Sequence, residues 1–147
     1  WFAWTASSGS GFKQAQVQIV ELNTSNYSVI SQWQIWNDNY AFAFPSLSTS
    51  GQGEVGISLA WGGNQDYGNH AVGFLGDFIV WYPEASDAAL TRWGDYVSVR
   101  RSVPDPNLFD ASGYAVFKQT PPAAGIRFDP YYIQFGRPSA GGGSPIN

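Results

Sequence analysis

The segment FPSLSTSGQGEVGISLAW, residues 44–61, has the pattern of a β-hairpin. A short alternating run leads into SGQG, and glycine and serine placed between two strand-like runs signal a tight hairpin turn. The run EVGISLAW follows the turn, and its β-branched and aromatic side chains suit a strand. The segment therefore predicts two antiparallel strands joined by residues 50–53.

Apolar and polar residues alternate with a period of two along the rest of the chain, which favours strands over helices. The opening WFAWTAS, residues 1–7, also reads as a strand. Residues 84–90, EASDAAL, are the one helix-like stretch, at most a turn or two long. The fold class predicted from this pattern is all-β. Further predicted strands are residues 15–22, 27–36, 76–82, 95–101, 112–119 and 126–135.

Composition supports an all-β domain and excludes several functions. Aromatic residues make up 17% of the chain, with 17 Gly and nine Pro, and such a mixture is typical of strands between tight turns. The net charge of −4 with only seven basic residues disfavours nucleic acid and anionic membranes as partners. No apolar run approaches the roughly 20 residues of a membrane helix. Without cysteine there is no disulfide, thiolate catalysis or cysteine-bound zinc. Because the chain lacks methionine and opens on a strand, we expect a processed, secreted parent protein or a segment of a longer chain.

A weak repeat suggests how the strands are grouped. Residues 95–117, DYVSVRRSVPDPNLFDASGYAVF, share the strand–turn–strand plan of residues 44–61, and the two segments start about 50 residues apart. This spacing suits four-stranded propeller blades, so we expect about three antiparallel blades in residues 1–137, with breaks near Asn37 and Trp93. Three blades cannot close a ring of the usual four to eight or so, so further chain or other copies would complete it. A β-sandwich is the structural alternative. Residues 138–147 are rich in Gly, Ser and Pro and read as a tail or linker.

Three segments carry a resemblance to a known group of proteins. FAFPSLSTSGQGEVGISLAWGG, RWGDYVSV and RFDPYYIQFGRP resemble the C-terminal part of secreted bacterial β-propellers of the sialidase-like, neuraminidase-superfamily type, over residues 41–138. The RWGDY segment is the most specific element. The resemblance implies propeller blades and, by analogy, glycan-related function. The Asp-box S-x-D-x-G-x-T-W is absent, and the arginine triad with its Tyr/Glu pair and Asp has no matching positions here. The resemblance therefore implies the fold and not the enzymatic activity.

The RWGDY segment is a candidate site with two interpretations. Arg92 could bind a carboxylate, while Trp93 or Tyr96 could stack on a sugar ring. In the structural interpretation Arg92 and Asp95 pair or cap strand ends, and Gly94 lets the backbone turn tightly. The structural interpretation, a clamp between blades, is favoured, because a propeller needs aromatic side chains between its sheets.

The surplus of aromatic residues points to a second candidate surface. WFAW, QWQIW and VWY place aromatic rings at alternate or nearly alternate positions. Trp33 and Trp36 are three residues apart, so they cannot share one face of a regular strand. One of them is therefore a candidate for exposure, where tryptophan stacks on sugars or forms an interface hot spot.

Catalysis and metal binding find less support in the sequence. Glycoside hydrolysis needs two opposed carboxyl groups, and no pair stands out among the three Glu and the Asp residues near strand ends. The lone His70 has no G-x-S-x-G nucleophile partner, so a surface-loop or strand-start position is expected for it. Calcium is possible at residues 37–39, 62–66 and 104–107, whose oxygen ligands also suit ordinary turns.

Two functions remain open from the sequence. The first is an extracellular, non-catalytic propeller module that binds a glycan or a protein, or builds a surface assembly. The second is the C-terminal part of a sialidase-like glycoside hydrolase, with its other catalytic residues outside this chain.

Overall fold

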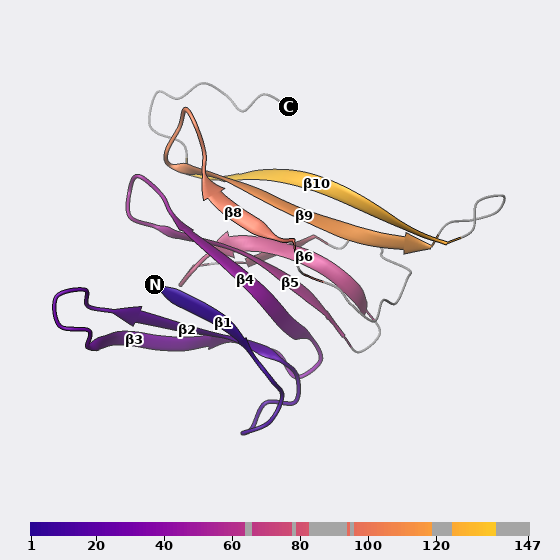
Figure 1. The fold of residues 1–147 in the computed structure, drawn as a ribbon, viewed down its shortest axis with the longest axis horizontal. Helices are drawn as coiled ribbons and strands as arrows, with labels where there is room; N and C mark the ends of the chain where they lie inside the picture. Colours follow the sequence, from indigo (N-terminus) through magenta and orange to yellow (C-terminus); the bar gives the residue numbers. More distant parts are fainter. Residues whose placement is uncertain (64–65, 78, 83–93, 95, 119–124, 138–147) are drawn as a thin grey trace.

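The computed structural model of the protein describes residues 1–63, 66–77, 79–82, 94, 96–118 and 125–137. These residues form ten β-strands in three antiparallel sheets and no helix (Figure 1). The all-β fold class is thereby confirmed. Within the described ranges there is accordingly no helix that could cross a membrane.

Sheet 1 has three strands in the order β1 (Phe2–Ala6), β2 (Gln16–Leu22) and β3 (Val29–Ile35). Each strand pairs with its neighbour in the chain, and a register shift opposite Glu21 and Leu22 leaves Ile30 as an extra residue in β3. The turn into β3 is closed by the side chain of Asn23, which accepts a hydrogen bond from the Ser25 N–H at 2.8 Å.

Sheet 2 has four strands in the order β4 (Ala41–Thr49), β5 (Val55–Gly63), β6 (Asp66–Phe74) and β7 (Ile79–Tyr82). The predicted hairpin turn joins β4 to β5. There the buried Ser50 hydroxyl accepts hydrogen bonds from the N–H groups of Gln52, at 3.2 Å, and Glu54, at 3.1 Å. The serine thus satisfies backbone donors that the turn leaves unpaired.

Sheet 3 has three strands, β8 (Ser98–Arg101), β9 (Leu108–Lys118) and β10 (Ile126–Gly136), with β9 in the middle. The two repeated sequence segments correspond to β4–β5 and β8–β9, the first two strands of sheets 2 and 3. The repeat therefore reports a shared plan at the level of strands.

The sheets stack face to face, with sheet 2 between the other two (Figure 1). Strand β5 is buried from Val55 to Trp61, because sheets lie on both of its faces. Ile57, Leu59 and Trp61 belong to the core with sheet 1, while Gly56 on the other face lies against the Phe109 ring of sheet 3. The core between sheets 1 and 2 contains Val17, Ile19, Phe42, Ile57, Leu59, Trp61 and Ala71. The core between sheets 2 and 3 contains Val72, Phe74, Val99, Phe109, Ala111 and Ile133.

The first strands of the sheets contact one another, but the contacts between sheets are not limited to them. Strand β1 lies against β4, and β4 lies against β8, whereas no comparable contact joins β3 to β7 or β7 to β10 among the described residues. The Phe44 N–H donates to Thr5 Oγ1 at 2.8 Å, and the Val99 N–H donates to Ser46 Oγ at 3.2 Å. Strand β6 lies against β9 almost as extensively, so sheets 2 and 3 also pack together away from their first strands.

The predicted grouping of strands agrees in part with the structure. The chain passes from sheet 1 to sheet 2 between Ile35 and Ala41, as expected from the break near Asn37, and from sheet 2 to sheet 3 between Tyr82 and Ser98. The second predicted break, at Trp93, lies outside the described residues, as do the helix-like residues 84–90 and the tail, residues 138–147. The described strands form three sheets, so the two-layer β-sandwich considered as an alternative is wrong for this chain.

Candidate functional site

Trp36 is the exposed member of the predicted tryptophan pair. It follows β3, and 54% of its side chain is accessible. Its indole meets the ring of Phe12 edge to face, with centroids 5.7 Å apart. Lys13 Nζ bonds Asp38 Oδ2 at 2.7 Å and joins the two loops that carry these rings. We call Phe12, Lys13, Trp36 and Asp38 the Trp36 cluster; it presents an anchored aromatic ring beside a polar pair.

Trp33 lies on the opposite face of β3 and is half-buried. It pairs with Ile19, so it points toward sheet 2, and its ring meets Trp1 edge to face at 5.7 Å. Its Nε1–H donates to Ser31 Oγ at 3.3 Å. Trp33 also lines a hollow of about 150 Å³ at the seam with sheet 2, beside Leu75 and Gly76. Of the two tryptophans, Trp36 is the exposed one and follows β3, while Trp33 lies within β3 and serves packing.

The RWGDY segment is described at two positions. Gly94 is buried with a φ of +102°, and its N–H donates to the Tyr114 hydroxyl at 2.8 Å. A Cβ at Gly94 would overlap the ring of Phe44 in sheet 2. Because Gly94 contacts both sheet 2 and sheet 3, this position supports the structural interpretation of the segment.

The remaining residues of that segment contribute no described binding site. Tyr96 is 80% exposed just before β8, and no described contact brings it to Trp33 or Trp36. The predicted binding residues Arg92, Trp93 and Asp95 lie outside the described residues.

The outer face of sheet 1 is an exposed surface that contains no charged strand residue. Because Val17 and Ile19 point into the core, the alternate residues of β2 point away from sheet 2, together with their cross-strand partners. Phe2 and Trp4 on this face are 59% and 45% exposed. The face is uncharged and combines apolar side chains with glutamines, and exposed rings in such a setting are candidates for contacts with a partner. The residues that define this outer face are Phe2, Trp4, Gln18, Val20, Gln32 and Gln34.

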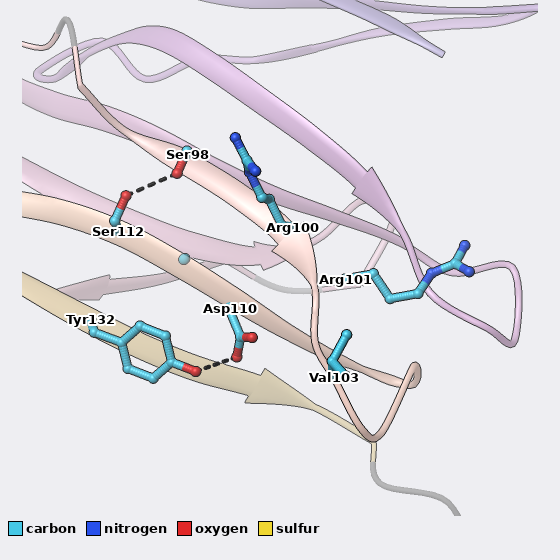
Figure 2. Close-up of a pocket in the computed structure, with 8 residues that line it drawn as sticks. Ser98, Arg100, Arg101, Val103, Asp110, Ser112 and Tyr132 are labelled. Atoms are coloured by element: carbon cyan, nitrogen blue, oxygen red, sulfur yellow. Dashed lines mark hydrogen bonds between the residues drawn. The ribbon is translucent and has the colours of Figure 1, made fainter.

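The outer face of sheet 3 is polar and hollowed. The hollow has a volume of about 310 Å³ and lies over β8, β9 and β10 (Figure 2). Ser98 and Ser112 join their hydroxyls at 2.9 Å across two strands. Tyr132 is 63% exposed, and its hydroxyl donates to Asp110. The strand residues that define this outer face are Ser98, Arg100, Asp110, Ser112, Tyr132 and Gln134.

The exposed side chain of Arg100 lies at this hollow. Arg100 is directly opposite Asp110 in the strand register, yet Figure 2 shows its side chain extending away from Asp110. Among the described residues no carboxylate lies within ion-pair distance of the Arg100 guanidinium. Asp110 instead accepts hydrogen bonds from Tyr132 and from Gln134 Nε2, the latter at 3.1 Å. The guanidinium is therefore available to a ligand or partner.

The pKa of Tyr132 is raised, chiefly by the hydrogen bond to Asp110. Desolvation of the phenol and the negative charge of Asp110 raise it further. The phenol is thus held in its protonated form. A tyrosine that acts as a nucleophile needs the opposite shift, because the phenolate is the reactive species. The hollow is suited to binding through hydrogen bonds and shows no activated nucleophile.

The position predicted for His70 is wrong. The residue lies in the middle of β6 and is fully buried between sheets 2 and 3, with Nε2 at 2.6 Å from Ser58 Oγ. The strand was missed because its glycines and polar residues resemble a loop. Since no solvent reaches the pair, Ser58 and His70 cannot meet a substrate.

The predicted calcium loops use their side-chain oxygens locally where they are described. Asn37 Oδ1 accepts the N–H of Asn39 at 2.8 Å, and Asp105 Oδ1 accepts the N–H of Asn107 at 3.0 Å. Both are Asx turns. No group of three or more His, Asp or Glu gathers within the described part of the chain.

Sequence reasoning named Trp33 and Trp36 without choosing between them, and it missed the residues of the hollow. Arg100, Asp110 and Tyr132 come from three strands, and only the strand register brings them together. The alternation of Phe2 and Trp4 was visible in the sequence. No family model, curated protein or solved structure matches the chain.

Proposed function

We propose that the chain is a non-catalytic extracellular module, built of propeller-type blades, that binds a glycan or a protein. The Trp36 cluster is the binding site in this proposal. The observation that carries it is an exposed indole that packs edge to face against the neighbouring ring of Phe12.

The arrangement of the sheets supports blades of a propeller. Each sheet is a simple meander whose first strand lies at one edge, and the three first strands, β1, β4 and β8, follow one another along the stack. Propeller blades are likewise small antiparallel sheets that are arranged around a central channel. Loops at the ends of such strands, where Trp36 lies, commonly carry binding residues on a rigid scaffold.

Tryptophan supplies much of the energy in glycan and protein recognition. Its large rigid ring buries apolar area at a small cost in side-chain entropy, and its N–H bonds a polar partner. The Lys13–Asp38 pair next to Trp36 is exposed and adds hydrogen-bonding groups more than stability. The cluster thus combines a stacking surface with polar groups at its rim.

Two features weigh against the alternative of a glycan-active enzyme within these residues. The pKa of Tyr132 is raised, which disfavours a phenolate nucleophile. His70 is buried without access to substrate. An enzyme would therefore need catalytic groups from outside the described residues.

A glycan array and a sialoside hydrolysis assay on the same sample test this proposal. We expect capture of at least one glycan or protein ligand without release of sialic acid. Trp36→Ala should weaken capture at least about tenfold, because loss of a hot-spot ring costs more than 1 kcal/mol. Tyr27→Ala, an exposed aromatic at the opposite end of sheet 1, is the matched control and should bind normally. Hydrolysis of the sialoside, or equal capture by Trp36→Ala and the wild type, would overturn the proposal.

A further inference from the structure

The outer faces of sheets 1 and 3 are the two ends of the stack of sheets. The exposed rings of Phe2 and Trp4 lie on the outer face of sheet 1, and the exposed side chain of Arg100 lies on that of sheet 3. We infer that a second copy of this chain covers both faces. The outer face of sheet 1 in each copy packs on the outer face of sheet 3 in the other, so that two copies close one ring of sheets. This inference rests on the propeller-type arrangement in the proposed function.

The two faces are chemically complementary. Among the described residues, sheet 1 presents the rings of Phe2 and Trp4 with no charged strand residue in its outer face, and sheet 3 presents the Arg100 guanidinium with no carboxylate within ion-pair distance. An arginine placed over an aromatic ring is stabilised by the ring's negative face, more so when water is excluded. Gln18 and Gln34, joined at 3.2 Å, offer an uncharged amide pair that a guanidinium can also bond.

The shapes are complementary as well. The outer face of sheet 3 is hollowed by about 310 Å³ between Arg100, Val103 and Tyr132 (Figure 2). The outer face of sheet 1 carries Trp4 as a large exposed side chain. A protruding ring that enters a hollow is the usual core of a protein interface.

The contact continues a packing that the chain already uses twice. Sheet 1 packs on sheet 2 and sheet 2 on sheet 3, and in both cases the first strands contact each other. Placing β1 of a second copy beside β8 extends the row formed by β1, β4 and β8. Two copies contribute twice the three sheets of one chain, which lies within the range of roughly four to eight blades in closed propellers.

This geometry is a head-to-tail contact that closes after two copies. Each copy uses its sheet 1 once and its sheet 3 once, so a two-fold axis relates the two identical contacts. Closure also removes the exposed apolar face of sheet 1, which would otherwise favour aggregation.

The test measures mass in solution, by light scattering after gel filtration, over a range of protein concentrations. The wild-type chain should have twice the 16.0 kDa mass of one copy. Trp4→Lys and Arg100→Glu should each shift the mass to that of one copy, with at least tenfold weaker association. Tyr27→Lys, in the turn between β2 and β3, is the matched control and should keep the double mass. Circular dichroism checks that all variants are folded.

Mixing the two interface variants gives the decisive result. In a head-to-tail pair, one contact then has both faces unmodified and the other places the new Lys beside the new Glu, so the double mass should return. A pair formed by two sheet 1 faces would instead leave Arg100→Glu associated and show no rescue, which would overturn the inference. A single-copy mass for the wild type, or a mass beyond two copies, would also overturn it. Ligand capture that depends on Trp36 in a single-copy protein would leave the proposed function standing.

Discussion

His70 shows how a polar residue is accommodated between two sheets. Its ring is fully buried, contacts Ser58 at 2.6 Å and has Tyr131 beside it with ring centroids 5.6 Å apart. Burial lowers the pKa of His70 from 6.5 to about 4. The imidazole is therefore neutral in the folded protein at pH 7 and takes up a proton more readily in the unfolded chain.

This shift predicts acid sensitivity within a defined pH range. Below pH 6.5 the unfolded state binds a proton that the folded state resists, so the free energy of unfolding should fall as the pH drops toward 4. The loss from this group reaches about 3 kcal/mol, at about 1.4 kcal/mol for each unit of pKa, and does not grow below pH 4. Urea unfolding at a series of pH values measures it. His70 is the sole histidine, so a His70→Gln variant with the same pH slope as the wild type would contradict this explanation.

Gly113 makes room for the His70 ring. A Cβ at this position would overlap the imidazole, which is packed on all sides and cannot move away. Gly113→Ala should therefore lower the free energy of unfolding by about 1–3 kcal/mol, as overpacked core substitutions do. Ser112→Ala, on the outer face of the same strand, is the control. Equal stability of the two variants in urea unfolding would show that the sheets can separate at no cost.

At the scale of elements, the sequence predicted strands well where alternation and turns coincide. The hairpin β4–β5 was predicted because glycines and Ser50 mark its turn. Strand β6 was missed because its sequence, DYGNHAVGF, lacks a regular apolar face. Its small residues and His70 are explained only by the close approach of sheet 3, and a single sequence does not reveal that approach.

Arg137 fastens the end of β10 to sheet 2. Its guanidinium bonds both Glu54 and Asp77, which lie in two different turns of sheet 2, and stands 4.4 Å from the centroid of the Phe74 ring. Both ion pairs are partly exposed, so each contributes at most about 1 kcal/mol, and the ring adds a similar amount.

Replacing Arg137 should loosen the attachment between sheets 2 and 3. Arg137→Ala is expected to lower the free energy of unfolding by about 1–2 kcal/mol, with a smaller difference at high salt because exposed ion pairs are screened. Arg137→Lys should recover only part of the loss, since an ammonium group lacks the two separate nitrogens and the planar face with which the guanidinium bonds Glu54 and Asp77 and lies over Phe74. A salt-independent loss would indicate that packing on Phe74 dominates.

At the scale of the whole molecule, two cores share sheet 2. Ile19 belongs to the core with sheet 1, and Phe109 to the core with sheet 3. Because β5 is covered on both faces, loss of either core exposes a face of the same strand. The three sheets should therefore unfold together.

Core truncations on either side test this cooperativity. Ile19→Ala should cost about 2–5 kcal/mol and Phe109→Ala about 3–5 kcal/mol. Both should shift one common transition when unfolding is followed by far-ultraviolet circular dichroism and by tryptophan fluorescence. Val29→Ala, at an exposed position of β3, is the control. Separate transitions for the two probes would show that a sheet detaches by itself.

The candidate site was predictable only where it depends on one strand. Trp33 and Trp36 were both recognised as candidates from the sequence, but only the structure shows that Trp36 follows β3 and is the exposed one. The hollow of sheet 3 was not predictable, because Arg100, Asp110 and Tyr132 meet through pairings between strands that are separated in sequence by a turn or more. Chemistry that depends on register is set by tertiary structure, and residue types alone do not indicate it.

The meander order of the strands bears on how the chain is made. In each of the three described sheets every strand pairs with the strand next to it in sequence. The hydrogen bonds of these sheets can therefore form without a segment from elsewhere in the chain. Local pairings of this kind form quickly because little chain entropy is lost in closing them. Sheet 1 can complete its ladder once Ile35 has left the ribosome, and sheet 2 can then assemble on it. We expect the protein to fold during synthesis, one sheet after another from the N-terminus.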